Sequence, residues 1–135
     1  MELKELYQLA ENRDIRVEHF HLEANKALTA EYIPGSFAIA LDDKKIENKT
    51  EEKMCIAHEL GHCESGAFYM AQSPFETIGR CEARVFRWEL DKMLPYEKLE
   101  KAFKKGYTES WELAEYFDLP EDFVRKAVKH YNSTE

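Results

Sequence analysis

Apolar side chains follow two different spacings along the first third of the chain. Residues 1–11 place them three and four apart, which predicts an amphipathic helix. Residues 15–22 are rich in β-branched and aromatic side chains and predict a strand. A Pro-Gly turn then separates residues 28–33 from residues 37–41, and this pattern predicts two strands in a hairpin. The first third therefore predicts a helix followed by a small sheet.

A second helix is predicted near the middle of the chain. Asn48 or Thr50 is placed to cap it, and acidic residues in its first turn suit the positive end of the helix dipole. The sequence is mainly apolar over residues 54–60, as expected of a buried helix, and Gly66 signals its end. Because a helical glycine costs about 1 kcal/mol relative to alanine, Gly61 marks either the close approach of another segment or the start of the helix end.

A third helix is predicted to begin after residue 72. Ser73-Pro74-Phe75-Glu76 matches a capping box with proline at the first helical position, and Pro95 stops the helix near residue 93. A projection at 100° per residue separates an apolar face from a charged one. The apolar face carries Ile78, Cys81, Val85, Trp88 and Met93, and the charged face carries Arg80, Arg84, Arg87 and Asp91.

The last third predicts three short helices. Residues 95–105 form the first, with Tyr96, Leu99 and Phe103 inward; Thr108 caps the second, and Pro120 begins the last. The final two helices, joined by a short turn, also fit a helix-turn-helix unit that reads DNA. Residues 107–135 carry seven acids against three lysines and arginines, the wrong sign for contact with phosphates. We therefore expect these helices to pack under the rest of the domain or to form a partner surface.

Size and composition indicate one globular domain. A chain of 135 residues with 44% hydrophobic and 34% charged residues is expected to form a single domain over residues 1–135, with a core at 1–94 and a helical extension at 95–135. The net charge of −8 disfavours nucleic acid and anionic membranes as partners. Three cysteines without a CxxC pair, and no signal-like or membrane-spanning apolar run, predict a protein of the cytoplasm.

The chemistry of the chain is concentrated in Ala57-His58-Glu59-Leu60-Gly61-His62. Residues four apart on a helix lie one above the other, so His58 and His62 are predicted to point the same way and to grip one ion. This is the H-E-x-x-H pattern, in which both histidines bind zinc and the glutamate is the general base of a metallohydrolase. The alternative is an ordinary buried helix on which two histidines happen to fall four apart. His19 and His21, with no third partner nearby, are interpreted as surface residues.

A catalytic zinc needs a third protein ligand, and two glutamates of the third helix are candidates. Glu82 and Glu89 lie on nearly the same line of the predicted helix, but two turns, about 10 Å, separate them, so both cannot reach one ion. The projection alone leaves the two nearly equal. Either residue is alternatively a partly exposed glutamate paired with a nearby arginine. Cys63 and Cys81, adjacent to His62 and Glu82, are less suitable, because adjacent helix positions point about 100° apart.

The sequence resembles the ImmA/IrrE family of zinc metallopeptidases, which are often carried by prophages and mobile elements. The resemblance covers most of the chain and rests on residues 57–63, on Gly66-Ala67-Phe68-Tyr69 with Ser73-Pro74-Phe75, and on Glu82 to Pro95. It implies that Glu82 is the third zinc ligand, and that Val85 stands where the family usually has alanine. It also implies an α+β fold, a zincin-like domain in which a small sheet packs on a mostly helical body.

The predicted function is that of a zinc-dependent endopeptidase. His58, His62 and Glu82 hold Zn²⁺, Glu59 is the catalytic base, and Tyr69 or Arg80 steadies the oxyanion. The family implies the substrate, a helix-turn-helix repressor of a prophage or mobile element. Zinc peptidases commonly hold extended substrates on an edge strand, but the sequence does not say whether residues 37–41 have a free edge. Two alternatives stay open: a non-catalytic regulatory module that binds a repressor or DNA through its C-terminal helices, and a purely structural zinc.

Overall fold

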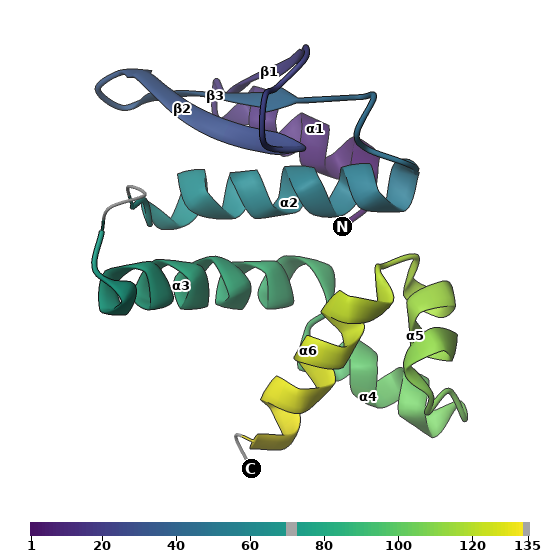
Figure 1. Ribbon diagram of the computed structural model, residues 1–135. Coiled ribbons are helices and arrows are strands. Elements are labelled where there is room, and N and C mark those ends of the chain that lie inside the picture. Colours follow the sequence, from purple (N-terminus) through teal and green to yellow (C-terminus); the bar gives the residue numbers. More distant parts are fainter. Residues whose placement is uncertain (70–72, 134–135) are drawn as a thin grey trace.

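The described residues form a small sheet and six helices in an α+β arrangement (Figure 1). The structure is a computed structural model and describes residues 1–69 and 73–133. The elements are α1 (Leu3–Asn12), β1 (Arg16–His19), β2 (Ala27–Ile33), β3 (Ser36–Leu41), α2 (Lys49–Ser65), α3 (Phe75–Met93), α4 (Tyr96–Lys104), α5 (Ser110–Phe117) and α6 (Glu121–Ser133). The predicted α+β class is confirmed.

The sheet has the strand order β1-β3-β2, so β3 is its central strand. β3 pairs with β1 in parallel and with β2 in the predicted antiparallel hairpin. The strand at residues 37–41 therefore has no free edge, because both of its sides are paired. β2 lies at one edge of the sheet instead, and this strand is the one that borders the cleft described below.

Helix α2 lies between the sheet and α3 (Figure 1). The Asn48 side chain caps it by accepting the Glu51 N–H at 2.8 Å, so Asn48 rather than Thr50 is the cap. Ile56, Ala57 and Leu60 are fully buried in its middle, as the apolar run predicts. Gly66, with a φ of +66°, ends the helix in the left-handed conformation that glycine adopts most readily.

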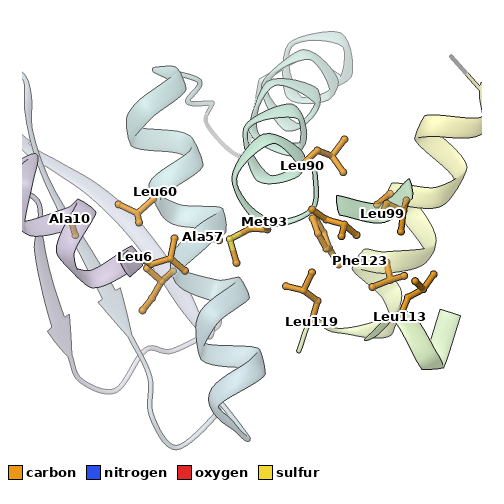
Figure 2. Packing of buried hydrophobic residues seen from close by; sticks show 14 of the residues in the cluster. Leu6, Ala10, Ala57, Leu60, Leu90, Met93, Leu99, Leu113, Leu119 and Phe123 are labelled. Atoms are coloured by element: carbon orange, nitrogen blue, oxygen red, sulfur yellow. The ribbon is translucent and has the colours of Figure 1, made fainter. Parts of the chain in front are cut away.

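One hydrophobic core runs from the sheet through α2 to the C-terminal helices. Figure 2 shows Leu6 and Ala10 of α1 on one side of α2, and Leu90 and Met93 of α3 on the other. The same cluster continues through Leu99, Leu113, Leu119, Phe123 and Val124, all of them buried. The helices after residue 95 are thus joined to the sheet, α2 and α3 by shared packing. The predicted division at residue 94 is not tested by this packing, and residues 134 and 135 of the expected extension lie outside the described residues.

Two predicted helix caps are wrong. Helix α3 begins at Phe75, so Pro74 is its N-cap residue rather than its first helical residue, and no side-chain hydrogen bond caps the helix there. At the start of α5 the cap is Glu109 rather than Thr108, because Glu109 and Glu112 form a reciprocal capping box. In both cases the observed cap lies one residue after the predicted one. Sequence patterns do not define helix ends to within one residue.

The predicted inward face of α4 is also partly wrong. Leu99 is buried as expected, but Tyr96 and Phe103 are 45% and 37% exposed. Ala102, three residues after Leu99, occupies the second inward position instead. Tyr96 lies at the rim, where its ring packs edge-on against that of Tyr131 of α6, with ring centroids 5.5 Å apart.

Among the described helices, none is both long and apolar enough to cross a membrane.

Helices α2 and α3 approach each other closely at Gly61. A Cβ atom at this position would lie 2.9 Å from Val85 Cγ1 and 3.4 Å from the Trp88 ring. The glycine therefore marks a close approach, one of the two predicted explanations. It also makes room for Val85, the side chain that is larger than the alanine usual at this position in the family that the sequence resembles. This contact brings the His62 end of α2 against the Glu82 end of α3.

Two helical glycines provide a matched test of this contact. We expect Gly61→Ala to lower the free energy of unfolding by about 1 kcal/mol, because overpacking against the stiff, buried Val85 outweighs the gain in helix propensity. Gly79→Ala on α3, where a Cβ meets nothing within 4 Å, is expected to raise the same free energy by about 0.5–1 kcal/mol. Urea unfolding of the metal-free variants measures both. Equal stabilisation by the two substitutions would contradict the close approach.

Candidate metal centre

Three of the predicted residues lie together between α2 and α3. His58 and His62 are one turn apart on α2, and their ring centroids are 4.9 Å apart. Glu82 of α3 faces both: its Oε2 lies 3.8 Å from His58 Nε2, and its Oε1 lies 3.9 Å from His62 Nε2. One ligand atom from each residue lies within 4.8 Å of the other two. The two helices thus bring two imidazoles and one carboxylate to a single point.

The second nitrogen of each imidazole faces a hydrogen-bond acceptor. His62 Nδ1–H donates to the Ala67 carbonyl oxygen at 2.6 Å, in the loop that follows α2. His58 Nδ1 lies 3.5 Å from Glu89 Oε2. This carboxylate raises the pKa of His58 above its ordinary value, and the effect outweighs that of burial, which lowers it. Both rings are therefore oriented with Nε2 toward Glu82.

The donor set fits a zinc ion. Two neutral imidazole nitrogens and one carboxylate oxygen are a set that catalytic zinc accepts, with a fourth position left for solvent. The side chains of His58, His62 and Glu82 are 36%, 12% and 38% exposed, so the cluster borders solvent on one side. The role of these residues as ligands stays a prediction, but their chemistry and exposure are suited to it.

Glu89, the other candidate ligand, has a different position. Its side chain is only 8% exposed, and it faces the Nδ1 atom of His58 rather than the Nε2 atoms that point to Glu82. It is not part of the three-residue cluster. The interpretation of Glu82 or Glu89 as an exposed residue paired with arginine is not supported for either, since the ion pairs found for both lead to histidines.

Glu59, the predicted catalytic base, lies beside this cluster in the same cleft. Its side chain is nearly buried, and its Oε1 accepts a hydrogen bond from Thr29 Oγ1 at 2.8 Å. Thr29 belongs to β2, the edge strand, so the sheet fixes the position of a carboxylate that α2 supplies. Its role as a base is not tested by these contacts.

The two candidates for the oxyanion-stabilising side chain differ in position. Tyr69 lines the cleft, and its hydroxyl donates to Glu82 Oε1 at 2.7 Å, which with burial raises the pKa of Tyr69 to about 12. Arg80 lies on the exposed side of α3 and pairs with Glu76 at 3.6 Å. Tyr69 is therefore the better placed of the two. Cys81 contacts the Phe68 carbonyl oxygen and is outside the metal cluster.

A cleft of about 860 Å³ is lined by the metal cluster together with Thr29, Glu59, Tyr69 and Glu89. One wall is β2 with the segment before it, the floor is α2, and the opposite wall is α3. Pro120, just before α6, and Asp122, Phe123 and Lys126 in the first turns of α6 also line the cleft. The C-terminal helices therefore take part in the cleft as well as in the core.

Sequence reasoning missed three parts of this site. Thr29 gave only a weak signal, because threonine is common in strands. The Ala67 carbonyl gave none, since any residue has a backbone oxygen. The contribution of α6 to the cleft depends on packing between segments about 65 residues apart, which periodicity does not reveal.

Comparison with known proteins gives one match. The family model described as the IrrE N-terminal-like domain, Peptidase_M78, matches residues 10–129. No match was found among curated proteins or among solved structures. The matched range includes the two histidines, the three glutamates at the site and the part of α6 that lines the cleft.

Proposed function

The chain belongs to the Peptidase_M78 family of IrrE N-terminal-like domains, and on this premise we propose that it is a zinc-dependent endopeptidase. The resemblance to the ImmA/IrrE family that the sequence predicts is thereby confirmed. The observation that carries the proposal is the cluster of His58, His62 and Glu82 beside the Glu59 carboxylate in one open cleft. The alternative, an ordinary buried helix with two histidines four residues apart, does not explain why these four groups lie together at a cleft.

In this proposal, His58 and His62 bind the ion through Nε2 and Glu82 binds it through a carboxylate oxygen. Zinc, when bound, supplies a Lewis acid that polarises the scissile carbonyl and makes water easier to deprotonate. Tyr69 restrains Glu82 through its hydroxyl, and Ala67 restrains His62 through its carbonyl. These contacts hold the ligands near their binding geometry before the ion arrives, which reduces the cost of ordering them.

Glu59 is the general base of the proposed reaction. Its carboxylate takes a proton from the attacking water and passes it to the leaving amine. Thr29 occupies one oxygen, Oε1, by donating its hydroxyl hydrogen, and the second oxygen is left to hold the transferred proton. The near burial of Glu59 limits competing contacts with bulk water.

The edge strand β2 is suited to hold an extended substrate. Asp42 N–H donates to the Lys26 carbonyl at 2.9 Å, so Lys26 and Asp42 form a hydrogen-bonded pair of the antiparallel ladder. Because such pairs alternate, the backbone N–H and C=O groups of Ala27 and Thr29 turn away from β3. We propose that a substrate strand pairs with these groups, which places its backbone beside Glu59.

The proposed substrate is a helix-turn-helix repressor of a prophage or mobile element, as the family implies. The charge of the chain supports a basic partner, because its net charge is −8 and the five acids that line the cleft outnumber its two lysines, Lys26 and Lys126. A cytoplasmic location is part of the same proposal. Three free, partly buried thiols support it, since cysteines persist unpaired most readily in a reducing compartment.

The alternative in which α5 and α6 read DNA is less well supported. A recognition helix contacts bases through its N-terminal residues. Here Asp122, Phe123 and Lys126, in the first two turns of α6, face the cleft instead. The acidic balance of this segment also disfavours contact with phosphates.

Cleavage of a repressor in the presence and absence of zinc tests the proposal. The zinc-loaded protein is incubated with the helix-turn-helix protein encoded next to it and, separately, with a library of proteome-derived peptides. We expect mass spectrometry to detect internal cleavage that a zinc chelator abolishes and added zinc restores. Cleavage that is insensitive to the chelator would exclude a metallopeptidase. Peptides that all stay intact with the zinc-loaded protein would exclude a peptidase.

A further inference from the structure

Glu89 is a buried carboxylate near the C-terminal end of α3. Its side chain is 8% exposed, and removing an ionised carboxylate from water costs several kcal/mol unless a partner compensates. In the described part of the chain, the polar contact of this carboxylate is the one with His58 Nδ1 at 3.5 Å. Because burying this carboxylate costs free energy, we look for its role in the metal site rather than in the packing of the core.

The two histidines have the same orientation, although the contact of His58 Nδ1, at 3.5 Å, is longer than that of His62 Nδ1, at 2.6 Å. Each directs Nε2 toward Glu82 and Nδ1 toward an acceptor, which is the Ala67 carbonyl for His62 and the Glu89 carboxylate for His58. In zinc sites the second ring nitrogen of a ligating histidine is regularly bonded to a carboxylate or a carbonyl, which fixes the tautomer and raises the basicity of the ligand nitrogen. The acceptors for the two rings come from different segments, and yet the rings have the same orientation. Chance is therefore a poor explanation of this arrangement.

We propose that Glu89 is the positioning residue of this metal site: it holds His58 with the proton on Nδ1 and so presents Nε2 to the ion. This inference rests on the proposed zinc site. It gives α3 two separate tasks, because Glu82 binds the ion and Glu89, seven residues further along, orients a ligand that α2 supplies. The charges of the two carboxylates together balance that of a divalent cation.

A merely structural glutamate makes the opposite prediction. If Glu89 were only tolerated in the core, its replacement by a neutral residue of similar shape would leave zinc affinity unchanged. As a positioning residue, Glu89 strengthens zinc binding through His58, whatever its effect on the stability of the metal-free fold. Stability of the metal-free protein and affinity for zinc are therefore expected to change independently when the carboxylate is replaced.

The test compares Glu89→Gln and Glu89→Ala with Asp91→Asn, a control on the same helix whose side chain is 74% exposed. Zinc affinity is measured by competition with a chelator, and thermal unfolding is measured without metal. We expect Glu89→Ala to weaken zinc binding about 10- to 100-fold. Glu89→Gln is expected to weaken it less, because its amide oxygen still accepts from Nδ1–H. Asp91→Asn should bind zinc normally, and thermal unfolding of the metal-free variants shows whether any loss of zinc affinity comes from a loss of the fold.

Affinity within twofold of the wild type for both Glu89 variants would overturn the proposal. So would a nitrogen-15 NMR spectrum of the zinc-loaded wild type in which the proton of His58 is not on Nδ1. A wild type that binds no zinc would overturn this role together with the metal site. The readout is binding, so a chain that binds zinc but cleaves no peptide would refute the proposed activity and leave the role of Glu89 intact.

Discussion

Glu59→Gln is expected to keep its zinc and to lose peptide cleavage by about 10²- to 10⁴-fold in kcat, the range that general acid–base catalysis contributes. The amide has the shape of the carboxylate, and its oxygen can still accept the Thr29 hydroxyl hydrogen that Glu59 Oε1 accepts. The substitution therefore leaves the packing intact and removes only the ability to take a proton from water. Zinc content by mass spectrometry and initial rates on a cleaved peptide measure the two properties separately.

Glu64→Gln is the matched control for this experiment. Glu64 lies on the same helix near its end, and its carboxylate pairs with Arg13 at 2.9 Å, away from the cluster. We expect this variant to retain both zinc and cleavage. If Glu59→Gln keeps full biological activity, the chain acts as a binding module, and the peptidase account fails.

Replacement of His58, His62 or Glu82 by alanine is expected to remove zinc. A four-ligand site gives zinc roughly 10–16 kcal/mol of binding free energy, so one ligand contributes on the order of 2.5–4 kcal/mol, about 100- to 1000-fold in Kd. Each replacement should leave the protein without metal after dialysis, and without cleavage. Competition with a chelator measures the change in affinity.

His21→Ala is the control for the ligand replacements. The His21 side chain is 68% exposed and pairs with Asp42 at 3.2 Å, outside the metal cluster. It removes an imidazole from the chain without touching the cleft. Loss of zinc from this variant, or retention of zinc after replacement of either His58 or His62, would place the metal elsewhere.

The part of the site that α2 supplies was predictable from sequence, because the geometry of one helix determines it. The spacing of His58 and His62 fixes their common direction once α2 forms, and the signals for α2 were strong at both ends, with Asn48 as the cap and Gly66 at the end. Helical spacing also predicted α1, and the alternation of side chains predicted the hairpin of β2 and β3. These features depend on neighbours within a few residues.

The choice between Glu82 and Glu89 was not decidable from periodicity, because both lie on the same line of α3. The contact at Gly61 fixes where along α3 the histidines meet it, and this contact is a tertiary one. As a result Glu82 faces the Nε2 atoms and Glu89 faces an Nδ1 atom. The resemblance to a family supplied the assignment that the helical projection alone did not supply.

The remaining differences have the same cause. The exposed sides of Tyr96 and Phe103, and the wall that α6 gives to the cleft, follow from how the C-terminal helices pack on α3. A short helix has several faces of similar hydrophobicity, and only its partners decide which one is buried. Thr29 was overlooked for this reason too, since a strand pattern does not say which helix its side chains will meet.

A crystal structure of the zinc-loaded protein, with anomalous diffraction measured at the zinc edge, tests the metal centre most directly. We predict one strong peak bonded to His58 Nε2 and His62 Nε2 at about 2.0–2.1 Å and to a Glu82 oxygen at about 2.0–2.2 Å, with a solvent oxygen as the fourth ligand. A peak whose distances put the carboxyl oxygens of both Glu82 and Glu89 beyond bonding reach would contradict the account. So would a fourth protein ligand in the place of solvent, which would make the zinc structural.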